Sequence, residues 1–121
     1  MKNNKSIVIQ WGSAVAGREN IGLELFLGVT QYYDGLVKED KLGSSQVVIF
    51  ENGNLEKLSG MMTLSGSEEQ INTIIESEKH RENVTKATHI VNNVVLMTGQ
   101  TGDAVPTRIQ DLVKWRKELG L

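Results

Sequence analysis

Four short segments rich in apolar and β-branched residues limit the possible folds of this chain more than any other feature. Each segment has apolar residues at successive positions. They span residues 7–11, 46–51, 57–65 and 89–98, and the second contains Val47-Val48-Ile49-Phe50. Consecutive side chains of a β-strand point to opposite faces of a sheet. A sheet with one face in water would alternate apolar and polar residues. The pattern therefore predicts a sheet with two apolar faces, both of which need cover.

The segments between these strands have the periodicity of helices. Apolar residues recur at three- and four-residue steps from residue 18 to about residue 41, as on one face of an amphipathic helix. Ser67-Glu68-Glu69-Gln70 matches a capping box and predicts a helix that begins there, with a break near Ser77 and a charged surface helix after it. A last helix is expected over about residues 104–119. Asn52-Gly53, directly after the second strand, is a short-range signal for a hairpin between the second and third strands.

The predicted order is β-α-β-β-α-β followed by one helix, which is the ferredoxin-like arrangement. We therefore expect an α+β fold with a four-stranded antiparallel sheet. A chain of 121 residues fits one domain, because two domains would each have too few residues for a stable core. The expected domain spans residues 1–121, with a core of about residues 6–99.

The second apolar face of the sheet points to self-association. Both crossover helices of this arrangement lie on the same face, because such crossovers are right-handed. The other face needs a second copy of the chain, packed sheet to sheet in an isologous dimer, or the last helix of the same chain folded across it. We expect the homodimer.

Composition excludes several classes of function. The sequence has no cysteine, which rules out disulfides, thiolate metal sites and cysteine nucleophiles. Thirteen basic and 15 acidic residues give a net charge of −2, without the basic surplus typical of nucleic-acid-binding proteins. No apolar run approaches the roughly 18 residues of a membrane span, and residues 7–9 are too short a run for a signal peptide. We expect a cytoplasmic protein that binds neither nucleic acid nor a membrane. We also expect it to have no metal site and no cofactor.

The order of elements, Asn52-Gly53, the run from Gly60 to Ser67 and its continuation through Glu76-Ser77-Glu78-Lys79-His80-Arg81 resemble the dimeric α/β-barrel superfamily. The resemblance covers most of residues 6–99. That group includes antibiotic-biosynthesis monooxygenases, haem-degrading monooxygenases and many small uncharacterised proteins, to which this chain is most similar. The resemblance implies sheets packed face to face. Haem-degrading members place a ligating histidine about two turns into the second short helix, near Val84 here, so no haem ligand is carried over.

Four residues are candidates for binding a ligand: Trp11, Tyr33, His80 and Asn92. Trp11 ends the first strand, where the mouth of a barrel would open, although core packing or a dimer contact is the simpler interpretation. Tyr33 is one of two adjacent tyrosines, one of which should face the core. His80 lies in a charged stretch and is most simply a solvated residue. Asn92 offers an amide, although the pair with Asn93 more often forms a bulge or turn.

Three classes of function fit these observations. The first, which we favour, is a small-molecule-binding or accessory protein without a cofactor. The second is a cofactor-independent monooxygenase-like enzyme that acts on a small cyclic or aromatic substrate. The third is an assembly or regulatory module without a ligand. A pocket of roughly several hundred Å³ beside Trp11 or His80 would favour the first two classes, and a fully packed interior would favour the third.

Overall fold

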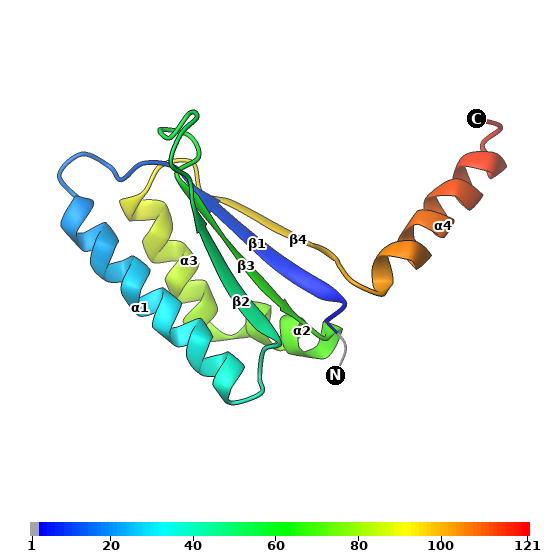
Figure 1. Ribbon diagram of the computed structural model, residues 1–121, viewed down its shortest axis with the longest axis horizontal. Helices are drawn as coiled ribbons and strands as arrows, with labels where there is room; N and C mark the ends of the chain where they lie inside the picture. Colours follow the sequence, from blue (N-terminus) through cyan, green and yellow to red (C-terminus); the bar gives the residue numbers. More distant parts are fainter. Residues whose placement is uncertain (1–2) are drawn as a thin grey trace.

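The computed structural model describes residues 3–121, so the two residues before them in the expected domain lie outside the description. Four strands and four helices follow one another along these residues (Figure 1). In chain order they are β1 (Lys5–Trp11), α1 (Glu19–Lys38), β2 (Ser44–Ile49), β3 (Gly60–Gly66), α2 (Glu68–Glu76), α3 (Glu78–Ile90), β4 (Val95–Gln100) and α4 (Ala104–Glu118). The predicted βαββαβ order with a C-terminal helix is confirmed.

The strands form one antiparallel sheet in the order β2-β3-β1-β4. In this register Ile7 lies opposite Leu64, and Ile9 lies between Met62 on β3 and Leu96 on β4. Directly opposed residues of an antiparallel pair point to the same side of a sheet. Figure 1 shows α1, α2 and α3 together on one side of the sheet, and α4 apart from them.

The hydrophobic core lies between this helix layer and the sheet. Its fully buried members come from β1, β3, α1, α2 and the segment after α1: Ile7, Tyr33, Leu42, Met62, Leu64, Ile71 and Ile74. The capping box at the start of α2 is formed as predicted. The Gln70 backbone N–H donates to Ser67 Oγ at 3.1 Å, and Gln70 Oε1 accepts from the Ser67 backbone N–H at 2.9 Å. Ser77 then ends α2 and caps α3, which confirms the break expected there.

Two boundaries differ from the sequence prediction. The fourth strand does not begin at residue 89, because α3 continues through His89 and Ile90. Asn93 follows in a left-handed turn (φ 56°), and β4 starts at Val95, as the Asn92-Asn93 interruption allowed. The second and third strands do form an antiparallel hairpin, but residues 50–59 connect them. Asn52-Gly53 lies within that loop, so the predicted hairpin is confirmed, and its loop is longer than the expected residues 52–56.

The second face of the sheet, called here the open face, has no cover within residues 3–121. Its apolar members are Val8, Val48, Met61, Val95 and Met97, and they alternate along the face with polar residues such as Gln10 and Thr63. Val48, Val95 and Met97 are 43–46% exposed. The face is therefore more polar than the sequence pattern implied. It is not roofed by α4, whose contacts with the rest of the fold are mainly with β4.

Candidate functional site

A cavity of about 340 Å³ lies between α1, α3 and the sheet. The end of β1, the loop after it and the segment between α3 and β4 complete its wall. The apolar side chains that line it are Ile9, Trp11, Leu23, Leu25, Phe26, Val29, Ile49, Met62, Val84, Ala87, Val91 and Val94. The interior is therefore not fully packed, and the space has the size and apolar character typical of a small-molecule site.

Trp11 forms one wall of the cavity because glycine leaves room for its ring. A Cβ at Gly60, which lies opposite Trp11 in the sheet, would come within 2.6 Å of the indole atom Cζ2. The indole also contacts Phe26 of α1, with ring centroids 5.9 Å apart and the rings inclined at 56°. The sheet and α1 thus fix the orientation of the indole, which presents an aromatic surface to the cavity.

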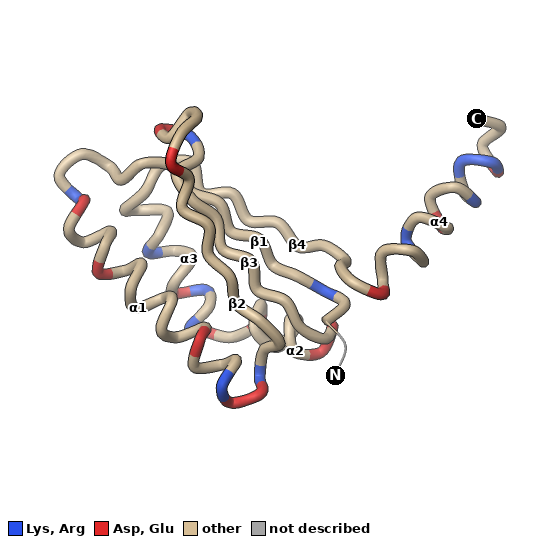
Figure 2. Tube along the Cα trace, viewed as in Figure 1, with Lys and Arg blue, Asp and Glu red and all other residues tan. Residues whose placement is uncertain are grey.

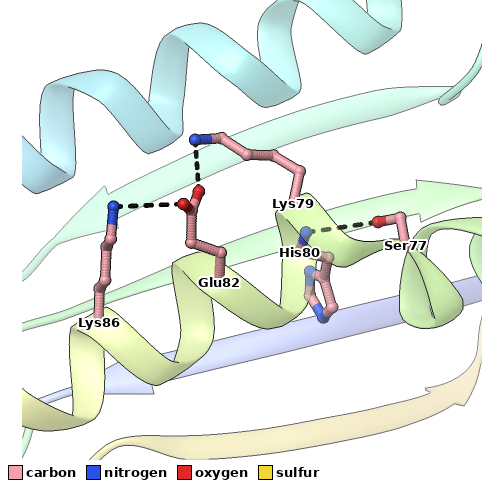
Figure 3. Close-up of polar contacts among 5 residues, drawn as sticks. All are labelled: Ser77, Lys79, His80, Glu82 and Lys86. Carbon is pink, nitrogen blue, oxygen red and sulfur yellow. Dashed lines mark hydrogen bonds and ion pairs between the residues drawn. The ribbon is translucent and has the colours of Figure 1, made fainter.

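A buried polar pair lies behind one end of the cavity. The Tyr33 hydroxyl and His80 Nδ1 are 2.6 Å apart. Tyr33 is fully buried, and His80 is 3% exposed. The His80 backbone N–H donates to Ser77 Oγ at 3.3 Å, as Figure 3 shows, so the cap of α3 positions the histidine in the first turn. Tyr33 lines the cavity, whereas His80 lies one side chain further from it.

Burial keeps both members of this pair neutral. Burial lowers the pKa of His80, because a desolvated imidazolium loses its hydration. Burial also raises the pKa of Tyr33 to about 12. The Asn83 side chain beside the hydroxyl lowers this pKa, but by less than burial raises it. The Tyr33 hydroxyl and His80 Nδ1 share one hydrogen bond, in which the donor is set by the imidazole tautomer: the phenol donates when the ring proton is on Nε2, and Nδ1–H donates when it is on Nδ1.

Asn83 is the functional candidate that sequence reasoning missed. It is 5% exposed, lines the cavity, and its Nδ2 makes no hydrogen bond of ordinary geometry within the described chain. A buried donor without an acceptor costs about 1–3 kcal/mol. Asn83 stands among charged residues in the sequence, and this pattern indicated a solvent-exposed helix. The spacing of His80, Asn83, Val84 and Ala87, however, follows one helix face and could have revealed it.

The structure treats the four predicted site residues differently. Trp11 and Tyr33 both line the cavity. The interpretation of His80 as a solvated residue was wrong, because the first turn of α3 packs against α1. Asn92 is exposed and lies outside the lining. Its Nδ2 donates to the Ser13 carbonyl oxygen at 3.2 Å, and its backbone bonds to Gly12 and Ser13, so it joins the end of β1 to the turn before β4.

The opposite side of α3 is a charged surface, as the sequence predicted. Glu82 accepts from Lys79 Nζ at 2.8 Å and pairs with Lys86 Nζ at 3.4 Å (Figure 3). The hydrogen bond from Lys79 is the main reason that the pKa of Glu82 is lowered. These exposed pairs contribute little to stability. Within residues 3–121, no group of three or more acidic, histidine or cysteine side chains could hold a metal ion.

Comparison with solved structures relates this architecture to known proteins. A dimeric protein of unknown function from Bacteroides fragilis aligns with a TM-score of 0.60 and 5% identity, over 83% of this chain and 98% of that one. An EthD-family protein from Bacillus halodurans aligns with a TM-score of 0.59 and 10% identity, over 82% of this chain and 99% of that one. An antibiotic biosynthesis monooxygenase-like protein from Deinococcus radiodurans aligns with a TM-score of 0.57 and 13% identity, over 83% of this chain and 93% of that one.

This chain has the ferredoxin-like fold. At these identities the likeness shows the fold alone, because one fold supports many activities. No protein-family model matches the sequence, and no curated protein matches it. Among the described helices, none is both long enough and apolar enough to cross a membrane.

The buried histidine predicts a specific dependence of stability on pH. An unfolded chain protonates histidine near about pH 6.5, whereas folded His80 takes up its proton only at lower pH. The unfolded state therefore binds more protons below about pH 6.5, and the free energy of unfolding falls as pH falls. His80→Gln should reduce this decrease between pH 7.5 and 5, measured by urea denaturation. His89→Gln, at an exposed position, should retain the wild-type slope. An unchanged slope in His80→Gln would refute the assignment.

Proposed function

We propose that this protein binds a small, largely apolar molecule in the cavity between α1, α3 and the sheet, without a cofactor. The observation that carries the proposal is the cavity itself, about 340 Å³ in volume and walled by apolar side chains. A module that only assembles would gain stability by filling such a space, because interiors are normally packed to high density. The empty volume therefore favours a ligand over a purely structural role.

The polar groups at the cavity restrict what the ligand can be. Asn83 Nδ2 is buried beside the Tyr33 hydroxyl and makes no hydrogen bond of ordinary geometry, so it can donate to a ligand acceptor such as a carbonyl, ether or hydroxyl oxygen. The Tyr33 hydroxyl, which shares a hydrogen bond with His80 Nδ1, is a second polar group at the cavity that a ligand can contact. The Trp11 indole offers a face for stacking. These groups together suit a planar or cyclic apolar molecule with one oxygen-containing group.

Ligand binding can be tested with 2-naphthol, a bicyclic aromatic molecule with a single hydroxyl. We expect saturable binding by isothermal titration calorimetry, weakened about tenfold or more by Ala87→Phe, because the new ring occupies part of the cavity. The matched control is Ala16→Phe, at an exposed position outside the lining. Equal affinities for all three proteins would place the binding elsewhere and contradict the proposal.

The second candidate function is a cofactor-independent monooxygenase-like enzyme acting on a small cyclic or aromatic substrate. The observation that favours it is the neutral Tyr33–His80 pair at the cavity, with Trp11 also in the wall. A substrate stacked on Trp11 would have a proton donor and acceptor pair at one end. One neighbour in fold is described as monooxygenase-like, which is compatible with this candidate.

Oxygen uptake with a panel of phenols distinguishes the enzyme from the binding protein. If the enzyme hypothesis holds, one of the phenols will stimulate uptake, and Trp11→Phe will abolish it while the protein stays folded. Trp115→Phe, on the distant α4, is the matched control and should keep full turnover. Uptake that persists unchanged in Trp11→Phe would deny Trp11 a chemical role.

We also infer that two copies pair through the open face. Its five apolar side chains lie exposed or half-buried in a single chain, and two neighbours in fold are described as dimeric. Face-to-face pairing would bury the same surface on both copies, as an isologous dimer requires.

The predicted dimer has twice the mass of the 13.4 kDa chain. Sedimentation equilibrium at micromolar concentration should give this mass, and Val48→Asp should weaken association by placing a carboxylate within the apolar contact. Leu27→Asp, on the exposed side of α1, is the control and should leave association unchanged. A single-chain mass for the wild-type protein would disprove pairing.

A further inference from the structure

α4 projects from the rest of the molecule as an arm (Figure 1). Its large apolar residues are between 38% and 75% exposed, and none of its residues is buried. They are Val105, Ile109, Leu112, Val113 and Trp115, with Leu119 directly after the helix. This contrasts with α1 to α3, each of which buries at least one residue against the rest of the fold.

The exposed residues of this arm form a stripe. Val105, Ile109 and Leu112 are spaced by four and three residues, and Leu119 follows seven residues later, so all four lie on one helix face. Thr107 lies on the opposite face. A helix of about 12–15 residues is marginally stable in water without packing. The stripe therefore needs a surface to pack against.

The arm and the rest of the chain carry opposite net charge. α4 carries four basic and two acidic residues, a surplus of two positive charges. The whole chain has a net charge of −2, so the remaining residues carry −4. Figure 2 shows acidic positions along α1, on the helix side of the sheet, and basic positions toward the end of α4. Opposite net charges favour the approach of a basic arm to the acidic body of a second copy, whereas area and position bear on the contact itself.

Area and position support the same partner. A stable homodimer buries about 800 Å² on each copy, roughly 500 Å² of it apolar, whereas the five apolar side chains of the open face supply on the order of 300 Å². The exposed apolar side chains of α4 add on the order of 400 Å². α4 also begins shortly after β4, the edge strand that contributes Val95 and Met97 to the open face. The arm therefore starts beside the surface that it would enlarge.

We propose that α4 packs on a second copy of this chain and enlarges the dimer interface that begins on the open face. The inference rests on the proposed pairing and goes beyond the neighbours in fold. Three of them align over 98–99% of their own length but only 81–83% of this chain, leaving about a fifth without a counterpart. That share is comparable to α4 with its flanking residues.

The fluorescence of Trp115 reports whether α4 packs and on which copy. The chain has two tryptophans, so Trp11→Phe leaves Trp115 as the single indole fluorophore. We expect its emission to shift to shorter wavelength over the protein concentrations at which the mass doubles. A shorter-wavelength emission in the monomer would mean that α4 packs on its own chain. A solvent-like emission in the dimer would mean that α4 stays free. Either result overturns the proposal.

Charge substitutions on α4 separate this inference from the pairing of the sheets. Leu112→Asp should raise the dimer dissociation constant about tenfold or more, whereas Thr107→Asp adds the same charge on the opposite face and should change it less than about twofold. Circular dichroism checks that both variants stay folded. If Val48→Asp weakens the dimer and Leu112→Asp does not, the sheet pairing stands and the α4 proposal fails. If only Leu112→Asp weakens it, α4 forms the dimer without the open face, and both the sheet pairing and its proposed enlargement by α4 fail.

Discussion

The packing of three helices against a single face of the sheet determines the rest of this structure. Ile7, Met62 and Leu64 fill the contact from the sheet side, and Ile71 and Ile74 fill it from α2. Because right-handed crossovers place α1 and the α2–α3 pair on the same side, one face of the sheet is covered and the other stays open. The cavity lies on the helix-covered side of the sheet. The open face is on the other side, so the proposed ligand site and the proposed pairing surface are separate.

The Tyr33–His80 pair shows how this packing produces chemistry from ordinary residues. Each side chain comes from a different helix, and the capped first turn of α3 brings the imidazole to the phenol. Burial keeps both groups neutral, so the imidazole tautomer sets the direction of their hydrogen bond. Such a pair can support binding or proton exchange, and the apolar wall around it strengthens each polar contact by lowering the local dielectric.

Local signals predicted the architecture well, and the site less well. The capping box at Ser67 and the apolar runs fixed the order of elements, because they act over a few residues. The residues of the site depend on helix rotation, which is a tertiary property. His80 and Asn83 stand among charged residues, and only the contact of α3 with α1 turns them inward. Asn52-Gly53 correctly marked the hairpin, but the length of its loop depends on contacts outside the hairpin. The β2–β3 loop is held by longer-range bonds, including Ser59 N–H to the Trp11 carbonyl and Ser13 N–H to the Glu56 carbonyl.

Gly60, the first residue of the interior strand β3, links the sheet to the size of the cavity. The nearest atoms to a Cβ at this position belong to the Trp11 ring, followed by the carbonyl oxygen of Val48. The backbone oxygen cannot yield, so even a methyl group would have to displace the indole from its position between Gly60 and Phe26. Natural variation at this strand position would thus reshape the cavity through Trp11, although Gly60 does not itself line it.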